Sequence, residues 1–197
     1  MAKEESKQRF LVAGRALLAA GSPLGVNAVA AASGLNKVLL YRYFGDWDGY
    51  LKHVAEGINL WRFLRIELTE GLSSDRWPDA AAASGWILNA YQQRLRNEPG
   101  ILTIMATEQA GSSPLLARLD DERESEGMLI LQALWEKWPL LPKQRFLTLS
   151  ALFSAGLSHL ALRSRQTTVF NGLDLSKEET WAALIEEIEG LVRTLLK

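Results

Sequence analysis

Residues 25–44 read GVNAVAAASGLNKVLLYRYF, and this stretch predicts two short helices joined by a tight turn. The first helix is rich in alanine. Gly34 follows it, at a position where a left-handed backbone conformation carries no Cβ penalty. Asn36 is placed to cap the second helix by accepting a hydrogen bond from a free backbone N–H. Leu40 and Phe44 are four residues apart and share one helix face, so we expect them to anchor this helix to the rest of its domain.

The opposite face of the second helix combines cations, aromatic rings and aliphatic side chains. A short exposed helix of this composition is what a reader of the DNA major groove needs. The face consists of Lys37, Val38, Leu39, Tyr41 and Arg42. The alternative is an ordinary helical hairpin in which Val38 and Leu39 belong to the core.

The stretch resembles the helix-turn-helix of the TetR (tetracycline repressor) family of transcriptional regulators, over about residues 7–55. The resemblance implies an all-α fold of about nine helices. It also implies a DNA-binding domain over residues 1–46 and a helical regulatory and dimerisation domain over residues 47–197. The matching features are Val29-Ala30, Ser33-Gly34-Leu35, Lys37, Leu40-Tyr41-Arg42 and Phe44.

By this resemblance the chain is expected to bind double-stranded operator DNA and to act as a repressor. Tyr41 and Tyr43 would hold phosphates, and Lys37 would contact a phosphate or a base edge. Val38 and Leu39 stand where the family commonly has small or hydroxyl residues, and aliphatic side chains can pack on thymine methyl groups. The predicted DNA-binding residues are Asn36, Lys37, Val38, Leu39, Tyr41, Arg42 and Tyr43.

The rest of the chain is expected to be helical, without strands or repeats. A stripe of apolar residues at three- and four-residue steps predicts one long helix over residues 47–72. Residues 143–165 are nearly apolar all round, so that helix must be central or shared with a partner. Ser176 and Glu179 match a capping box at the start of the last helix. Further helices are expected over residues 6–20, 80–96, 101–110 and 115–138.

The family forms homodimers through its last two long helices, and we expect the same association here. One recognition helix reads too few base pairs for useful specificity, which also favours a two-fold dimer. The alternative is that the same side chains are intramolecular core. The predicted interface residues are Phe146, Leu149, Phe153, Leu184, Ile188 and Leu191.

TetR-like regulators usually hold a small-molecule effector, and the aromatic content of this chain suggests a largely apolar pocket with few polar anchors. The alternative is again core packing, and for His159 the favoured interpretation is a satisfied histidine in the core or at an interface. The predicted pocket residues are Trp61, Trp86, Tyr91, Met105, Glu108, Trp135, Phe153 and His159.

The charge distribution is uneven along the 197 residues, although the net charge is only −1. Residues 1–65 carry nine Lys and Arg against five Asp and Glu, a net of +4, and the remaining residues carry a net of −5. A basic N-terminal segment on an acidic body suggests that one end meets phosphate.

Composition argues against an enzyme. Cysteine is absent and the two histidines are far apart in the chain, so a Cys–His pair or a His-rich metal site is not available. We therefore expect no cofactor and no metal. The N-terminus lacks a signal-peptide pattern and the longest uncharged run is short and polar, which predicts a cytoplasmic protein without a membrane span. The alternative function is a helical ligand-binding or scaffold protein whose helix-turn-helix no longer reads DNA.

Overall fold

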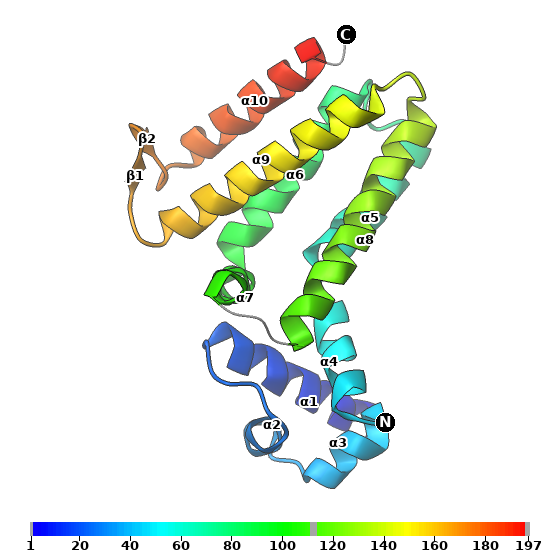
Figure 1. The fold of residues 1–197 in the computed structure, drawn as a ribbon, viewed down its shortest axis with the longest axis vertical. Coiled ribbons are helices and arrows are strands. Elements are labelled where there is room, and N and C mark those ends of the chain that lie inside the picture. Colours follow the sequence, from blue (N-terminus) through cyan, green and yellow to red (C-terminus); the bar gives the residue numbers. More distant parts are fainter. Residues whose placement is uncertain (1, 111–113, 196–197) are drawn as a thin grey trace. The chain divides into compact units, whose positions relative to one another are not determined.

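The structure is a computed structural model that describes residues 2–110 and 114–195, without the side chains of residues 2, 99, 104, 107–110 and 114–118. The described part consists of ten helices and one short β-hairpin, which confirms the predicted all-α fold of about nine helices (Figure 1). The elements are α1 (Ala2–Ala19), α2 (Val26–Ser33), α3 (Lys37–Phe44), α4 (Trp47–Glu56), α5 (Leu60–Ser73), α6 (Ala80–Asn97), α7 (Pro99–Ala110), α8 (Pro114–Lys137), α9 (Lys143–Ser164), β1 (Val169–Phe170), β2 (Leu173–Asp174) and α10 (Glu178–Leu195).

The chain packs into two compact units, each built from two stretches of sequence. The first unit contains Met1–Asn59 and Glu98–Glu122, and the second contains Leu60–Asn97 and Arg123–Lys197. By packing, α4 therefore belongs with α1, α2 and α3. The predicted boundary after residue 46 divides the chain by expected function and not by packing, and it stays a prediction.

The core of the first unit is formed where α1, α2, α3 and α4 meet. α1 packs against each of the other three helices and also against α7. Phe44 is central, because its ring makes edge-to-face contacts with Phe10 at 6.3 Å and with Tyr50 at 5.2 Å between centroids. The buried residues of this core are Phe10, Ala13, Val29, Leu40, Phe44, Tyr50, Leu51, Val54, Ala55 and Leu119.

The single helix predicted over residues 47–72 is wrong, because the chain breaks between α4 and α5. Gly57 ends α4, and a glycine costs about 1 kcal/mol relative to alanine inside a helix. Asn59 is buried in the break, and its side-chain nitrogen lies 3.5 Å from a carboxylate oxygen of Glu122. The apolar stripe continues across the break because both helices have a buried face, which explains why periodicity alone suggested one helix.

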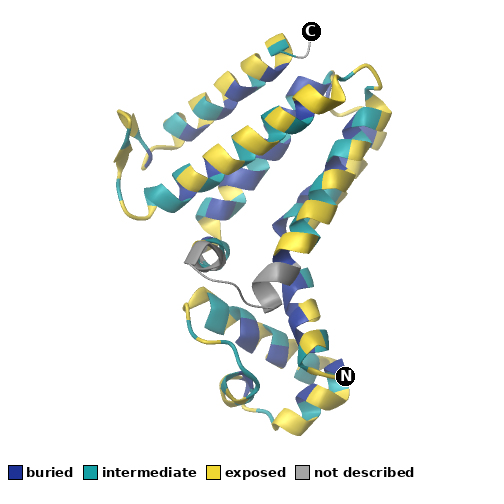
Figure 2. Ribbon diagram, in the orientation of Figure 1, coloured by how far each residue is buried: buried dark blue, intermediate teal, exposed yellow. Residues whose placement is uncertain are grey.

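In the second unit α6 is the central helix and packs against α5, α9 and α10 (Figure 1). Its sequence begins with small residues, and Gly85 lets α10 approach closely: a Cβ at that position would lie 2.7 Å from a carboxylate oxygen of Glu189. Arg65 of α5 forms an ion pair with Glu126 of α8. A second ion pair joins Lys137 of α8 to Asp75, which follows the end of α5. α10 has a regular buried side and an exposed side (Figure 2).

A two-stranded hairpin lies between α9 and α10, although no strands were expected from the sequence. Asn171 and Gly172 form its turn with positive φ angles of 48° and 84°, as expected for an Asn-Gly pair in a tight hairpin. The predicted capping box is wrong. The hydroxyl of Ser176 donates to the carboxylate of Asp174 at 2.6 Å, and α10 starts two residues after Ser176. The Asp174 carboxylate also accepts the Ser176 N–H, so this local turn uses the serine that the capping box required.

Candidate nucleic-acid interface

The turn between α2 and α3 has the geometry that its glycine suggested. Gly34 adopts a left-handed conformation, with φ 65° and ψ 25°, and its N–H points to the carbonyl oxygens of Ala30 and Ala31. The guanidinium of Arg9 on α1 donates to the carbonyl oxygen of Ser33 at 2.7 Å. The last turn of α2 is therefore bonded to α1, which fixes the position from which α3 begins.

The N-terminus of α3 is capped as predicted. The side-chain oxygen of Asn36 accepts a hydrogen bond from the N–H of Val38 at 2.9 Å. This bond satisfies one of the free donors of the first helical turn. The bond uses only the Val38 backbone, so the Val38 side chain remains free to face outward.

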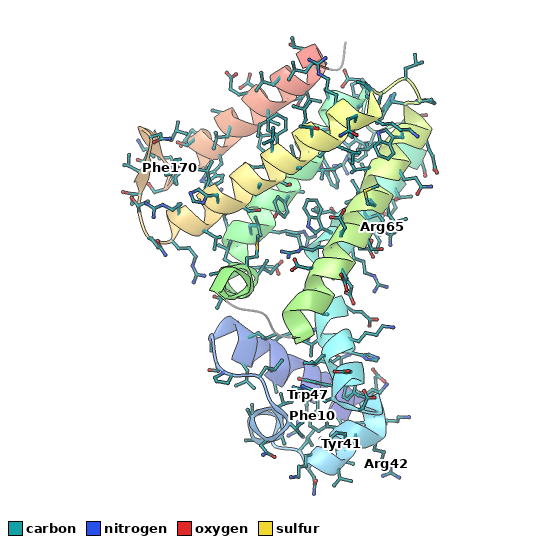
Figure 3. All side chains as sticks on the ribbon, viewed as in Figure 1. Phe10, Tyr41, Arg42, Trp47, Arg65 and Phe170 are labelled. Carbon is teal, nitrogen blue, oxygen red and sulfur yellow. The ribbon has the colours of Figure 1, made fainter. Side chains whose placement is uncertain are left out.

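α3 has a buried face and an exposed face. Leu40 and Phe44 are buried in the core of the first unit, as predicted. The opposite side, which we call the outer face of α3, is exposed (Figures 2 and 3). Val38 is 64% exposed and Tyr41 is 44% exposed, so neither belongs to the core. The outer face consists of Lys37, Val38, Tyr41 and Arg42.

Two of the predicted DNA-binding residues within α3 are not on this outer face, and Asn36 lies before the helix as its cap. Leu39 and Tyr43 are half-buried and pack against the core of the first unit. They flank the buried positions on the helix, and the neighbouring helices cover part of each side chain. Part of the Leu39 side chain is therefore covered by the core of the first unit, although the sequence had predicted that this side chain contacts the DNA groove.

Trp47, the first residue of α4, is used for packing. Its ring stacks on Tyr50 at 5.0 Å between centroids, with 26° between the planes. Asp46 caps the same helix by accepting a hydrogen bond from the N–H of Gly49 at 2.7 Å. The start of α4 is thus attached to the core by an aromatic stack.

Positive charge is concentrated around this unit's N-terminal helices. Residues 1–45 contain six Lys and Arg and two Glu, a net of +4. Lys7 lies over the ring of Phe44, with its ammonium 5.9 Å from the ring centroid. Arg9 is held by Ser33, so these two cations are placed by contacts with α3 and α2. A surface of this sign attracts polyanions.

The predicted effector-pocket residues do not form one constellation. Trp61 and Tyr91 do meet, with stacked rings 4.5 Å apart, and the Tyr91 hydroxyl lies 2.6 Å from the hydroxyl of Ser158. Trp86 instead packs on Trp77, 4.9 Å between ring centroids, in a separate contact.

The other predicted pocket residues are placed elsewhere. His159 is exposed, with its ring edge against Phe170. Phe153 is half-buried on α9. Met105 belongs to the first unit, and the side chain of Glu108 lies outside the described residues.

Trp135 is the pocket candidate with an unmet hydrogen bond. Its indole N–H is buried and has no partner among the described residues. Lys143 lies over the same ring, 5.2 Å from the centroid. A buried N–H without an acceptor destabilises the folded protein by about 1–3 kcal/mol. A ligand that supplied an acceptor to this N–H would recover part of that free energy.

Sequence reasoning missed an open groove between α6 and α10, about 710 Å³ in volume. The predicted pocket residues are not part of its lining. The lining mixes carboxylate and amide side chains with apolar ones: Asn89, Gln92, Gln93, Glu178, Trp181, Ala182, Ile185, Glu186, Glu189, Gly190 and Arg193. Arg96 donates to Glu178 at its rim, and this hydrogen bond lowers the pKa of the Glu178 carboxyl.

The predicted dimer residues divide into buried and accessible ones. Phe146 and Ile188 are buried in their own unit, so they offer little surface to a partner. Leu149, Phe153 and Leu184 are half-buried, and Leu191 is 49% exposed.

α9 leaves more apolar surface uncovered than these residues suggest. Leu152 is 63% exposed at its middle. Among the described helices, α9 alone is long and apolar enough to cross a membrane by length and composition, and 17% of its most apolar stretch is buried. Few side chains of α9 are therefore fully buried by the described part of the chain, so α9 presents apolar surface that these residues do not cover.

A scan of the chain against protein-family models finds no match, and a search among curated proteins finds none either. The likeness to TetR regulators therefore rests on the residues of the helix-turn-helix.

Proposed function

We propose that this chain is a DNA-binding transcriptional regulator of the TetR type, acting as a repressor. The observation that carries the proposal is the outer face of α3. It presents two cations, a tyrosine and an aliphatic side chain from a short helix that is capped at Asn36 and anchored by Leu40 and Phe44. A rigid exposed helix with this chemistry fits the major groove.

In this proposal Lys37, Tyr41 and Arg42 bind phosphates, and Val38 faces the base edges. Phosphate contacts position the protein and make binding depend on salt, whereas contacts to base edges give sequence specificity. The positive charge of residues 1–45 supports the same orientation toward DNA.

The regulator is proposed to bind as a homodimer, with the exposed sides of α9 and α10 against a second copy. The exposure of Leu152 and Leu191 supports this arrangement, since burying them would remove apolar surface from water. Two copies related by a two-fold axis would read two half-sites of one operator.

A small, largely apolar effector is proposed to modulate DNA binding from the second unit. The buried indole N–H of Trp135, which has no partner among the described residues, supports a ligand that brings one hydrogen-bond acceptor. Such a ligand changes DNA affinity only if it binds the two conformations of the protein unequally. A panel of apolar compounds screened for loss of DNA binding would identify it.

The decisive experiment measures binding to the DNA that flanks the protein's own coding region, by fluorescence anisotropy, with unrelated DNA as competitor and a salt series. Lys37→Ala combined with Tyr41→Phe should weaken specific binding at least about tenfold and lower its salt dependence. The matched control is Lys177→Ala, which removes an exposed cation from the second unit whose pair with Asp174 is solvent-exposed.

Two results would contradict the proposal. Unchanged specific affinity of the double variant would show that α3 is not the recognition helix. If no specific binding occurs to flanking DNA or to sequences selected from a random pool, the chain would instead be a helical ligand-binding or scaffold protein.

A further inference from the structure

Val38 is an isolated aliphatic side chain on an otherwise polar surface. It is 64% exposed and lies on the first turn of α3. Its neighbours on the outer face, Lys37, Tyr41 and Arg42, are exposed and carry polar groups. Leu39, the other aliphatic residue at this end, is partly covered by the core.

The fold does not need a valine at this position. The Asn36 cap uses the backbone N–H of Val38, and Leu40 and Phe44 anchor the helix. A β-branched residue also restricts χ1 freedom in a helix and is a weaker helix former than alanine. The Val38 side chain therefore adds little to the stability of the fold, and its exposed methyl groups can contact a ligand.

We infer that Val38 recognises the 5-methyl group of thymine in each half-site of the operator, an inference that rests on the proposed function. The thymine methyl is the apolar group that base pairs display in the major groove. Valine has no donor or acceptor, so it cannot form the paired hydrogen bonds by which purines are read.

The same contact explains how cytosine would be rejected. Cytosine carries no methyl group and presents an N4 amino donor to the groove. Against the Val38 side chain that donor would lose water without gaining an acceptor, which is costly. Thymine should bind best, uracil and 5-methylcytosine should be intermediate, and cytosine should be weakest.

The test first selects a tight site from a random DNA pool with the wild-type protein. Each thymine of that site is then replaced, one at a time, by deoxyuridine, which removes only the methyl group. At one position in each half-site the substitution should weaken binding about threefold to fivefold, the scale expected for one buried methyl. Replacing both half-sites together should weaken binding about tenfold or more.

Val38→Ala should abolish this difference between thymine and uracil, because the shorter side chain no longer reaches the methyl group. The variant should fold, since alanine is the better helix former. The matched control is Val12→Ala, which shortens another exposed valine of the first unit on α1. Val12→Ala should keep the full discrimination.

The possible outcomes separate the inference from the proposed function. Specific binding that is insensitive to every deoxyuridine substitution would overturn the inference and leave the regulator intact. Discrimination that survives Val38→Ala would overturn it too, because another residue would then contact the methyl group. If the wild-type protein selects no DNA, the proposed function fails and this inference fails with it.

Discussion

At the scale of single residues, Gly14 of α1 lies so close to the Tyr50 side chain of α4 that there is no room for a Cβ at residue 14. The Tyr50 hydroxyl donates to the carbonyl oxygen of Phe10 at 2.9 Å while lying directly over Gly14. A Cβ at residue 14 would overlap the hydroxyl oxygen. The small residue on α1 therefore allows a buried tyrosine to hydrogen-bond to the helix backbone.

Gly14→Ala should destabilise the protein by about 1–3 kcal/mol, because the added methyl group must displace Tyr50. Tyr50→Phe should recover part of that loss in the double variant, since it removes the atom that clashes. Urea unfolding of the two single variants and the double variant measures the coupling. Gly190→Ala is the control: nothing lies within 4 Å of its Cβ position in α10, so this change should be neutral or stabilise by up to about 1 kcal/mol. Equal losses at both glycines would contradict the prediction.

The same tyrosine makes stability depend on alkaline pH. Burial raises the pKa of the Tyr50 hydroxyl well above its ordinary value. The unfolded chain therefore loses this proton at about pH 10 while the folded chain keeps it. The stabilisation is complete below about pH 10 and is lost as the pH rises further. Urea midpoints at about pH 8 and about pH 11 should show a smaller alkaline loss for Tyr50→Phe than for wild type. An identical loss in the variant would show that other groups cause it.

At the scale of elements, the cap of α3 connects stability with the proposed DNA binding. Asn36→Ala should cost about 1 kcal/mol, because the Val38 N–H loses its side-chain acceptor. Asn36→Asp keeps that acceptor and adds a charge that the helix N-terminus favours. Stability should thus be preserved in the aspartate variant while DNA affinity falls through repulsion by phosphate. Unfolding curves and anisotropy titrations measure the two effects separately, and tight DNA binding by Asn36→Asp would count against the proposed interface.

The sequence predicted those turns and helix caps that depend only on residues close to them in the chain. The left-handed Gly34 and the cap at Asn36 occur where they were expected, since each depends on residues within a few positions. The break before α5 was not predictable, because Asn59 finds its partner at Glu122, far along the chain. The partial burial of Leu39 was missed for the same reason: neighbouring helices decide how wide the covered face of α3 is.

At the scale of the whole molecule, the outer side of α9 should control association. Leu152→Glu should convert a dimer into a monomer, because it places a charge in the surface proposed to meet a second copy. Sedimentation equilibrium at micromolar concentration measures this change. The control is Leu140→Glu, at a 98% exposed leucine in the turn between α8 and α9, which should remain dimeric. A monomeric wild-type protein, or a dimeric Leu152→Glu variant, would contradict the proposed interface.

The first unit is assembled from two separate stretches of chain, and this has a consequence for its history. α7 packs against α1, and Leu119 of α8 is part of the same core as Phe10 and Phe44. A fragment of residues 1–59 would leave that side of α1 bare. Recombination that exchanged only an N-terminal module would produce a poorly folded chimera. Residues 1–59 and 98–122 are therefore expected to evolve together as one folding unit, although residues 60–97 lie between them in the sequence.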